Sequence, residues 1–481
     1  MVRLAAAEAN PSALAAALDA RGRGRSMDEV RALALTGALG SGYLTSTLET
    51  ALAWDPDFIG VDAGSTDSGP ASLGTGACSF SRAAVKRDIK FALLGARQKR
   101  IPLLVGSAGT AGGDLNLAWM VGIVEEIARE EDLHFKLAVI HSEQDKQYLK
   151  RRFAEGRIKP LRPAPTLDES VIERSDHIVG MMGAEPYVRA LEEGAEVVIA
   201  GRSSDTSIFA AIPMQRGFDP GIVWHAAKIL ECGAASVVYR KHPDCMFARI
   251  RKDHFVMEPP NEEQACSPLS VAAHALYENS SPFDLYEPSG RLDIRDAVYT
   301  AESDRTVKVA GARFVPAERY TIKLEGAERV GFQSIVLGGI RDPELIGQID
   351  SWLELLREKV TERTTAAYGP AAADCLFTMR VYGKNGVLGK AEPLKDTVSH
   401  ELMLIMEATA PTQEMATSIA SSARHIGLHL PIPQWKGLIS ALAFPYTPAH
   451  LERGPVYRFT LNHILEPDDP FEMFPMELRR I

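Results

Sequence analysis

Three junctions in the chain place small, hydroxyl-bearing or charged residues directly after an apolar run. An apolar run that stops in this way is typical of a buried parallel strand that delivers a polar loop. Ligands of open α/β sheets bind at the carboxyl ends of the strands, so neighbouring strands would bring the three loops to one cleft. In the first junction the apolar run 58–61 precedes Asp62, Ser65, Thr66 and Asp67. In the second, the run 101–105 precedes Ser107, Gly109 and Thr110. In the third, the run 196–200 precedes Arg202, Ser203, Ser204 and Asp205.

The third junction carries the most specific chemistry. An arginine at the carboxyl end of a strand can bind a carboxylate through two hydrogen bonds, which makes Arg202 a candidate substrate anchor. Asp205 would orient the arginine or transfer a proton, and Ser203 and Ser204 would contact the substrate. The alternative is an Arg202–Asp205 pair that only fixes the loop.

The first junction offers two carboxyl groups. Asp62 or Asp67 would act as an acid or base, with Ser65 and Thr66 against the substrate. One alternative is a phosphate loop of the actin-like kinase type, in which Asp62 holds a metal ion. Another is a tight turn that Asp62 merely caps. The actin-type loop belongs in an early β-hairpin, whereas the pattern here predicts a helix and a crossover.

The second junction is rich in glycine and precedes a predicted helix. Free N–H groups at a helix N-terminus bind anions, so Ser107, Gly109 and Thr110 would hold a carboxylate or a CoA phosphate and stabilise negative charge. The spacing is not G-x-G-x-x-G, and Gly-Lys-Ser/Thr is absent, so neither a dinucleotide nor a Walker site is expected. We expect no cofactor.

Weaker signals lie outside these junctions. Lys384 and Asn385 would cover an anionic ligand, although their Asn-Gly sequence first indicates a hairpin. His425 and His429 have the spacing of a metal pair, but no acidic third ligand is obvious, so we expect a helix end and no metal. We assign the remaining candidate side chains to structural roles: His225, Glu231, Cys232, Cys245 and Cys266.

Strand-like runs and amphipathic segments alternate through the first half of the chain, as in βαβ units. Beyond about residue 237 the expected strands become short and alternating, which favours α+β structure. The expected fold class is α/β: a parallel, Rossmann-like (doubly wound) sheet in an N-terminal domain, then a smaller α+β C-terminal domain. We expect an N-terminal extension over 1–28, the Rossmann-like domain over 29–240, an α+β region packed on it over 241–370, and the C-terminal α+β domain over 371–481.

Composition excludes several classes of protein. The 481 residues are 46% hydrophobic and 24% charged, which is ordinary for two or three globular domains. A net charge of -10 without a basic patch disfavours nucleic acid as a partner. We expect neither a secretory signal nor a membrane span. Five scattered cysteines without a CxxC pair fit reduced thiols, so we expect a cytoplasmic protein.

In these residues and in their order, the chain resembles the acyclic terpene utilisation AtuA family over about its whole length. That family takes its name from a pathway that degrades citronellol-like terpenes through CoA thioesters. The resemblance implies a carboxylate or CoA-ester substrate and a small companion subunit as partner. The segments that carry it are the Gly37 loop, Asp-Ala-Gly-Ser at 62–65, Gly-Arg-Ser-Ser-Asp at 201–205, Ile-Leu-Glu-Cys-Gly at 229–233, Pro-Ser-Gly-Arg-Leu-Asp at 288–293, Arg-Val-Tyr-Gly at 380–383, Ala-Pro-Thr-Gln at 410–413 and Tyr-Arg-Phe-Thr-Leu-Asn-His at 457–463.

We therefore expect an enzyme of small-carboxylate or acyl-CoA catabolism. A lyase of the hydratase type or an isomerase needs an anion anchor and a placed acid or base, which Arg202 and one of Asp62, Asp67 and Asp205 would supply. The alternatives are a non-catalytic subunit that binds a ligand or partner, and an actin-like ATP-dependent kinase.

Two late segments bear on assembly. Residues 437–446 are apolar, and residues 471–476 contain two Phe and two Met. Either both segments complete the core of the second domain, or the tail lies across a neighbouring subunit in a homo-oligomer, most often a two-fold dimer. The second alternative predicts that removal of residues 470–481 lowers the oligomeric state first.

Overall fold

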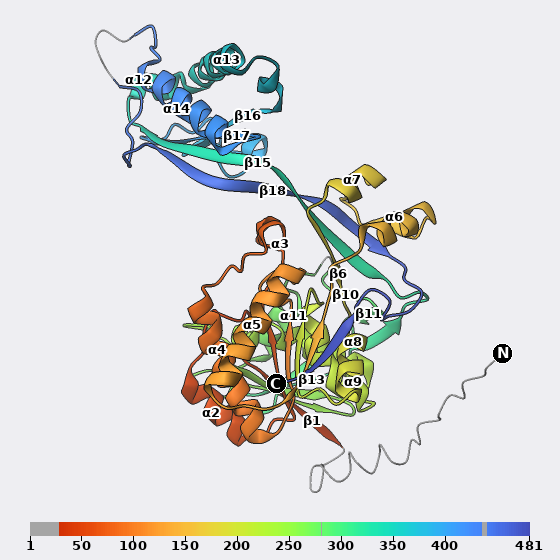
Figure 1. The fold of residues 1–481 in the computed structure, drawn as a ribbon. Helices are drawn as coiled ribbons and strands as arrows, with labels where there is room; N and C mark the ends of the chain where they lie inside the picture. The colour runs from red at the N-terminus through yellow and green to blue at the C-terminus, as the bar shows by residue number, and fades with distance from the viewer. Residues whose placement is uncertain (1–27, 280, 435–439) are drawn as a thin grey trace, which may run out of the picture.

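The computed structural model describes residues 28–279, 281–434 and 440–481. Residues 1–27 of the expected N-terminal extension and 437–439 of the late apolar segment lie outside them. The described chain forms an α/β lobe and a smaller distal lobe, which a long two-stranded ribbon connects (Figure 1). Among the described residues, none of the helices combines the length and the apolarity needed to cross a bilayer.

A mixed ten-stranded sheet, counted over the described residues, forms the centre of the α/β lobe. Its order is β12-β13-β9-β8-β1-β2-β3-β7-β4-β19. The run from β1 to β4 is parallel, and antiparallel strands flank it on both sides. This order is not the 3-2-1-4-5-6 order of a Rossmann fold, so the α/β prediction is confirmed and the Rossmann-like arrangement is not. The bounds are β1 Glu29–Ala34, β2 Phe58–Asp62, β3 Leu103–Gly106, β4 Lys136–Ile140, β7 Val197–Ala200, β8 Met246–Arg251, β9 Phe255–Glu258, β12 Val298–Ala301, β13 Val307–Ala310 and β19 Met476–Arg480.

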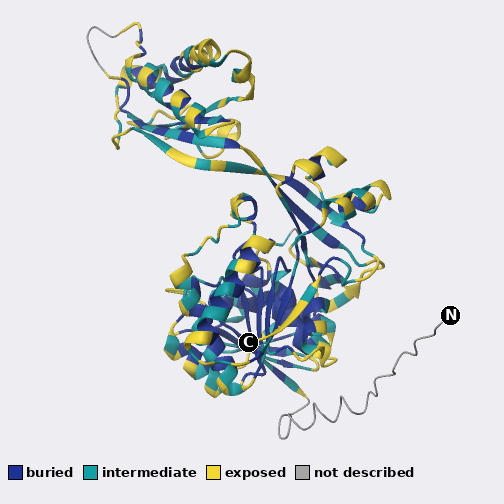
Figure 2. Cartoon of the chain, viewed as in Figure 1, coloured by how far each residue is buried: buried dark blue, intermediate teal, exposed yellow. Residues whose placement is uncertain are grey.

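Helices cover both faces of the parallel run, which is why its strands are continuously apolar. Successive strand side chains point to opposite faces. In β3, Leu103 and Val105 pack with α2, α4 and α5, whereas Leu104 packs with α8, α9 and α10. Figure 2 shows these strands as the buried centre of the lobe. The bounds are α2 Thr45–Ala53, α4 Arg82–Lys99, α5 Asp114–Glu130, α8 Glu185–Glu192, α9 Asp205–Gln215 and α10 Pro220–Leu230.

A second sheet has the order β16-β17-β15-β18-β5 in the described residues. Its strand β15 spans Ile322–Ile340 and pairs antiparallel with β18, His450–Leu465, along the ribbon. Strand β6 lies where the sequence predicts a strand of the parallel sheet, but it pairs antiparallel with β15 instead. The other bounds are β5 Ile158–Pro160, β6 His177–Met181, β16 Leu376–Tyr382 and β17 Leu402–Ala410.

The distal lobe consists of β16, β17 and the adjoining ends of β15 and β18, with helices on one face (Figure 1). Alternate residues of β17 are buried against those helices. The remaining short elements lie along the ribbon or against the α/β lobe, and β10, β11 and β14 form a small antiparallel sheet. The bounds are α3 Ala71–Thr75, α6 Lys146–Ala154, α7 Glu169–Arg174, α11 Pro268–Ala275, α12 Pro343–Gly347, α13 Ile349–Tyr368, α14 Gln413–His429, β10 Asp284–Glu287, β11 Gly290–Asp293 and β14 Arg313–Pro316.

The C-terminal tail belongs to its own subunit's core. Strand β19 pairs with β4 at the edge of the large sheet, and Met473 and Phe474 are buried in the same core as α8 to α10. Ala441 and Leu442 of the late apolar segment are likewise buried inside the distal lobe. The late apolar segment therefore contributes to the core of the smaller lobe, as the first alternative predicts, whereas the tail packs into the core of the α/β lobe, where neither alternative places it.

Phe474→Ala should lower the free energy of unfolding by about 3–5 kcal/mol, since it leaves a cavity in the core. Urea unfolding measures this change. Phe459→Ala is the matched control because Phe459 is 41% exposed, and it should change stability by about 0.5 kcal/mol or less. Equal effects of the two substitutions would contradict the placement of the tail.

Candidate active site at the carboxyl ends of the parallel strands

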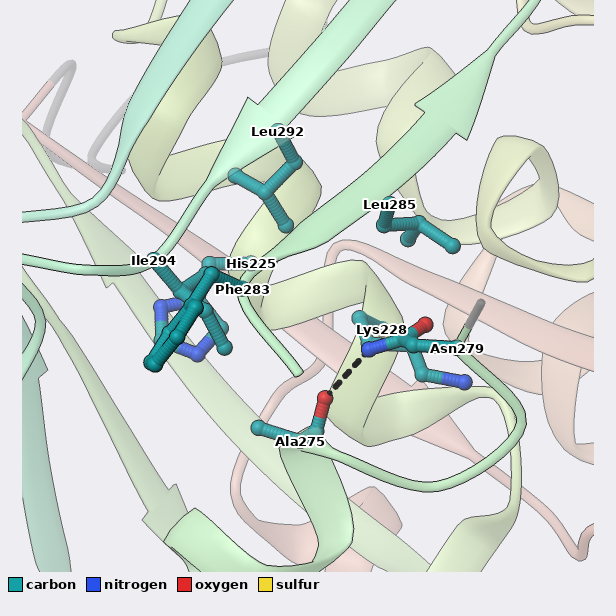
Figure 3. Close-up of a pocket in the computed structure, with 8 residues that line it drawn as sticks. All are labelled: His225, Lys228, Ala275, Asn279, Phe283, Leu285, Leu292 and Ile294. Atoms are coloured by element: carbon teal, nitrogen blue, oxygen red, sulfur yellow. Dashed lines mark hydrogen bonds between the residues drawn. The ribbon is translucent and has the colours of Figure 1, made fainter. Parts of the chain in front are cut away.

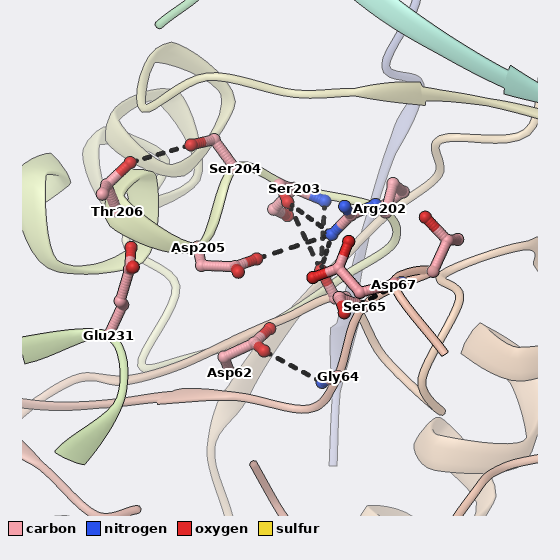
Figure 4. Close-up of polar contacts among 12 residues, drawn as sticks. Asp62, Gly64, Ser65, Asp67, Arg202, Ser203, Ser204, Asp205, Thr206 and Glu231 are labelled. Atoms are coloured by element: carbon pink, nitrogen blue, oxygen red, sulfur yellow. Dashed lines mark hydrogen bonds and ion pairs between the residues drawn. The ribbon is translucent and has the colours of Figure 1, made fainter. Parts of the chain in front are cut away.

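The three predicted junctions meet at one edge of the large sheet. Strands β2, β3 and β7 are consecutive parallel neighbours, as the sequence predicts. Backbone hydrogen bonds continue from the strands into the loops: Ala63 N donates to Gly106 O at 2.9 Å, and Ser107 N donates to Gly201 O at 2.9 Å. The loops after the three strands therefore lie side by side. Figure 4 shows side chains of the loops after β2 and β7.

Arg202 lies at the centre of these loops and is only 4% exposed. Its Nη1 donates to Ser107 Oγ and to the Ser203 carbonyl oxygen, both at 3.1 Å, and lies 3.5 Å from Asp205 Oδ1. Its Nε donates to Glu325 Oε2 at 2.9 Å. Among the described residues no hydrogen bond uses Nη2, which leaves one guanidinium nitrogen for a ligand.

Glu325 is a residue of the candidate site that sequence reasoning missed. It lies on β15, at the end of the ribbon nearest the α/β lobe, and is 4% exposed. Besides Arg202, it accepts a hydrogen bond from Thr66 Oγ1 at 2.9 Å, and Lys323 Nζ lies 2.8 Å from its other oxygen. Burial raises the pKa of Glu325, but Arg202 and Lys323 lower it to about 2. No local pattern marks a glutamate in a β-strand as the partner of an arginine far along the chain.

Asp62 and Asp205 have carboxyl groups with shifted pKa values. Burial and then the charge of Asp205 raise the pKa of Asp62 well above 3.8. Asp62 Oδ2 accepts a hydrogen bond from Gly64 N at 3.1 Å, whereas Oδ1 is buried without a partner among the described residues. Burial also raises the pKa of Asp205, which Arg202 opposes, and the net value is about 6. The surroundings of Asp62 therefore favour its protonated form, whereas Asp205, with a pKa of about 6, is mainly ionised at neutral pH.

Further polar side chains approach Asp205 from α10 and β10. Lys228 Nζ lies 2.5 Å from Glu231 Oε1, and both side chains are buried. Burial raises the pKa of Glu231, which Lys228 opposes, and Asp205 adds to the increase. Glu231, which the sequence analysis assigns to structure, therefore belongs to the same electrostatic cluster. The spacing of three between Lys228 and Glu231 is a helical ion-pair signal that could have found it.

Glu287 makes the free energy of unfolding of the chain depend on pH. Burial raises its pKa from 4.5 to about 7, although the hydroxyls of Thr206 and Ser204 oppose this. The folded chain therefore binds the proton more tightly than the unfolded chain does. The resulting stabilisation of about 3 kcal/mol is complete below a pH of about 4.5 and is lost as the pH rises to about 7.

Urea unfolding at a series of pH values checks this expectation. Glu287→Gln cannot ionise, so the variant should lose less stability than the wild type between a pH of about 5 and 8, and should be the more stable protein at the upper end. Parallel stability curves for the two proteins would show that Glu287 does not titrate as described.

The glycine-rich loop supports Arg202 more than it offers donors to a ligand. The N–H groups of Ser107, Ala108 and Gly112 already donate to Gly201 O, Ala200 O and Ala108 O. Gly112 has φ +69°, and a Cβ there would lie 2.1 Å from Arg202 N, so only glycine allows this close approach. Fewer N–H groups of this loop are therefore free to bind the negative charge of a ligand than the sequence predicts.

The other predicted residues divide into two groups. Ser65, Thr66, Ser107, Ser203 and Ser204 lie on the loops around Arg202, and the exposed Asp67 lies at their outer side, where its charge acts on Asp205. Gly109 and Thr110 are held inward: Asn116 Nδ2 donates to Gly109 O at 2.8 Å, and Ser79 N donates to Thr110 Oγ1 at 2.9 Å.

Lys384 and Asn385 do not join this site. They follow β16, which lies in the distal lobe (Figure 1). There Lys384 Nζ pairs with Asp350 Oδ2 at 3.0 Å. Local sequence shows a strand followed by a turn, but it does not show that the ribbon carries this turn away from Arg202.

His225 and the pair of His425 and His429 lie in other surroundings. His225 is fully buried, its Nε2 lies 3.1 Å from the Tyr299 hydroxyl, and burial lowers its pKa to about 3. Figure 3 shows His225 and Lys228 lining a separate, mainly apolar pocket with Phe283, Leu285, Leu292 and Ile294. The rings of His425 and His429 pack edge to face on α14, with their centroids 5.2 Å apart. Within the described ranges, no group of three or more His, Cys, Asp or Glu side chains is arranged to hold a metal ion.

The Asp62 loop also differs from a phosphate loop of the actin type. Strands β2 and β3 are parallel, with α3 and α4 between them, so the loop does not belong to a β-hairpin. The helix and crossover predicted after this loop are therefore confirmed.

Comparison with known proteins gives one match. The family model described as acyclic terpene utilisation family protein AtuA matches residues 87–237 and 247–436. Arg202, Asp205, Glu231 and Glu325 lie inside the matched segments, whereas the Asp62 loop precedes them. Neither the curated proteins nor the solved structures contain a match. Since the matched segments cover more than half of the 481 residues, the chain belongs to the acyclic terpene utilisation AtuA family.

Proposed function

We propose that this protein is an enzyme that transfers a proton next to the carboxylate or thioester group of a small substrate, as a lyase of the hydratase type or an isomerase. Its family membership implies a role in acyclic terpene utilisation. The site, and not the family membership, supports the class of reaction. The observation that carries it is the pair of Asp62 and Asp205 beside Arg202, at the carboxyl ends of adjacent strands.

Each group has a role in this proposal. Arg202 binds the substrate's carboxylate through Nη2, while Glu325 and Ser107 fix its guanidinium plane. Asp205, with a pKa of about 6, is ionised at neutral pH and accepts the proton. Asp62 keeps its proton and donates it. Two carboxyl groups whose environments separate their pKa values are typical of paired acid and base roles.

Two experiments in sequence test the proposal. A thermal-shift screen of hydroxyacids, dicarboxylates, amino acids and CoA esters should find a stabilising ligand, because a ligand at about 100 times its Kd adds about 2.7 kcal/mol. Incubation of that ligand in D2O should then place deuterium next to its carboxylate or thioester, seen by NMR. Arg202→Met should lose the stabilisation, with Arg319→Met as the matched exposed control.

The alternative of a non-catalytic binding subunit predicts a different result. Such a subunit would bind a ligand without exchanging its protons, alone or with a companion chain. Binding without deuterium incorporation at any pH between about 5 and 8 would therefore overturn the proposed enzyme.

A further inference from the structure

A second pocket lies on the ribbon, at the edge of the second sheet. Strand β5 pairs antiparallel with β18 there, and Pro160 is opposite His463. Because successive strand side chains point to opposite faces, Ile158, Pro160 and His463 share one face. Phe153 of α6 and Leu167 of the loop after β5 stand beside that face and enclose with it a pocket of about 340 Å³.

The pocket is separate from the candidate active site, although both adjoin β15. His463 is opposite Leu324 where β18 pairs with β15, and the next residue of β15 is Glu325. Neighbouring residues of a strand point to opposite faces, so His463 lies on the face of the sheet away from Glu325 and its partner Arg202. A ligand in this pocket would therefore contact different residues from a ligand of Arg202.

His463 is a polar side chain in an otherwise apolar row. Leu461, His463 and Leu465 alternate along β18 and are 1%, 3% and 0% exposed. Asn462 N donates to Nδ1 of His463 at 3.2 Å, and burial lowers the pKa of the ring, which favours its neutral form. A neutral imidazole whose Nδ1 accepts a hydrogen bond carries its proton on Nε2. Among the described residues nothing accepts a hydrogen bond from this Nε2, so a buried donor lines the pocket without an acceptor.

The pocket also has a positive charge at its rim. Arg162 lines the pocket and is exposed, and within the described ranges its guanidinium has no ion pair or hydrogen bond. Glu466, the carboxylate that follows β18, already pairs with Lys159 and Arg319. The charge of Arg162 is therefore left to attract an anion.

Hydrogen bonds fix the loop that forms one wall of the pocket. Leu161 N donates to Asn462 O at 3.0 Å. Asn462 Nδ2 donates in turn to the carbonyl oxygens of Leu161 and Pro163, at 3.2 and 3.0 Å. The backbone on both sides of Arg162 is thus tied to β18. A preformed wall lowers the entropy that a ligand must lose on binding.

We propose that this pocket is a second ligand site, which binds a small monocarboxylate with an apolar chain. A carboxylate oxygen accepts the hydrogen bond of His463 Nε2, and the negative charge faces Arg162. The chain packs against Phe153, Ile158 and Leu167. A pocket of about 340 Å³ is near the lower end of the range of about 300–1,000 Å³ that is usual for small-molecule sites, which favours a short chain.

Calorimetry with hexanoate and three matched ligands tests the inference. Acetate lacks the chain, hexan-1-ol lacks the charge, and hexylamine carries the opposite charge. Hexanoate should bind at least about tenfold more tightly than each of them, because its charge-assisted hydrogen bond and its apolar contacts act together. NMR of protein labelled with 15N in its histidines should show the His463 Nε2 signal moving with hexanoate, and His463→Gln identifies that signal.

Two substitutions locate the site. Arg162→Gln should weaken hexanoate binding several-fold without lowering Tm, since the position is exposed. Arg363→Gln, at an exposed position of α13, is the matched control and should leave binding unchanged. His463→Phe keeps an aromatic ring but removes the donor, so it should abolish the preference for hexanoate over hexan-1-ol. If His463→Phe does not fold, Arg162→Gln and the His463 signal decide the question.

Three results would overturn the inference. Equal affinities for hexanoate and hexan-1-ol would mean that the pocket does not recognise a carboxylate. Binding of hexanoate that leaves the His463 signal in place would put the ligand elsewhere, for example at Arg202. No binding of hexanoate would mean that the pocket is not a site for such acids. None of these results bears on deuterium exchange at the candidate active site, so the proposed function stands or fails separately.

Discussion

Asp205→Asn should slow deuterium incorporation into the substrate by about 10²–10⁴-fold, the usual contribution of a placed acid or base. Asparagine keeps the size of the side chain but cannot accept a proton. The hydrogen bonds of Arg202 to Ser107, Ser203 and Glu325 do not involve Asp205, so ligand affinity should change far less than the rate. NMR of the substrate in D2O measures the rate, and calorimetry measures the affinity.

The control for this prediction is Asp304→Asn, the same substitution at an exposed position. It should leave the exchange rate within about twofold, since surface substitutions usually change little. If Asp205→Asn retains the wild-type rate while Asp62→Asn loses it, the two carboxyls have the opposite roles. If both single variants retain it, neither group transfers the proton and the proposed mechanism is wrong.

Glu325→Ala should lower the free energy of unfolding by about 3–5 kcal/mol, because it leaves the buried Arg202 guanidinium without its counter-charge. Thr66 and Lys323 lose a partner as well. Urea unfolding measures the change. Glu452→Ala is the matched control, since Glu452 is exposed on the same ribbon and should cost about 0.5 kcal/mol or less.

The double variant Arg202→Met, Glu325→Leu separates stability from binding. Replacing both members of a buried ion pair with apolar residues is often neutral or stabilising, so the double variant should recover much of the stability that Glu325→Ala loses. It should still fail to bind the ligand that Arg202 anchors. Ligand binding by a stable double variant would show that Arg202 is structural only.

The sequence predicted the parallel strands and their loops well because those features are local. A run such as Leu103 to Val105 that is apolar at every position indicates a strand with both faces covered. One of the amphipathic segments expected between the strands is helix α4, Arg82–Lys99, which begins after Ser81, whose Oγ accepts from Ala84 N. The glycine-rich and serine-rich stretches after β3 and β7 are the loops around Arg202.

The partner of each later strand could not be predicted from local pattern. Strand β6 has the composition of a parallel strand but pairs with β15 of the ribbon. Strands β8, β9, β12 and β13 lie within 241–370, which we expect as an α+β region packed on the first domain, and they belong to the large sheet itself. Strand β19 closes the other edge of that sheet. Pairing depends on which edges remain open after the rest has folded.

By itself, the sequence determined that Asp62, Ser107, Arg202 and Asp205 stand at strand ends, since an apolar run and the polar residues that stop it are adjacent in the chain. Only the tertiary structure decided what these side chains contact. The ribbon brings Glu325 to Arg202 and carries Lys384 away from it, and α10 brings Glu231 near Asp205. The sequence around a charged residue does not identify the residue that will pair with it. Desolvation and Coulomb attraction act through space, so they depend on the completed fold.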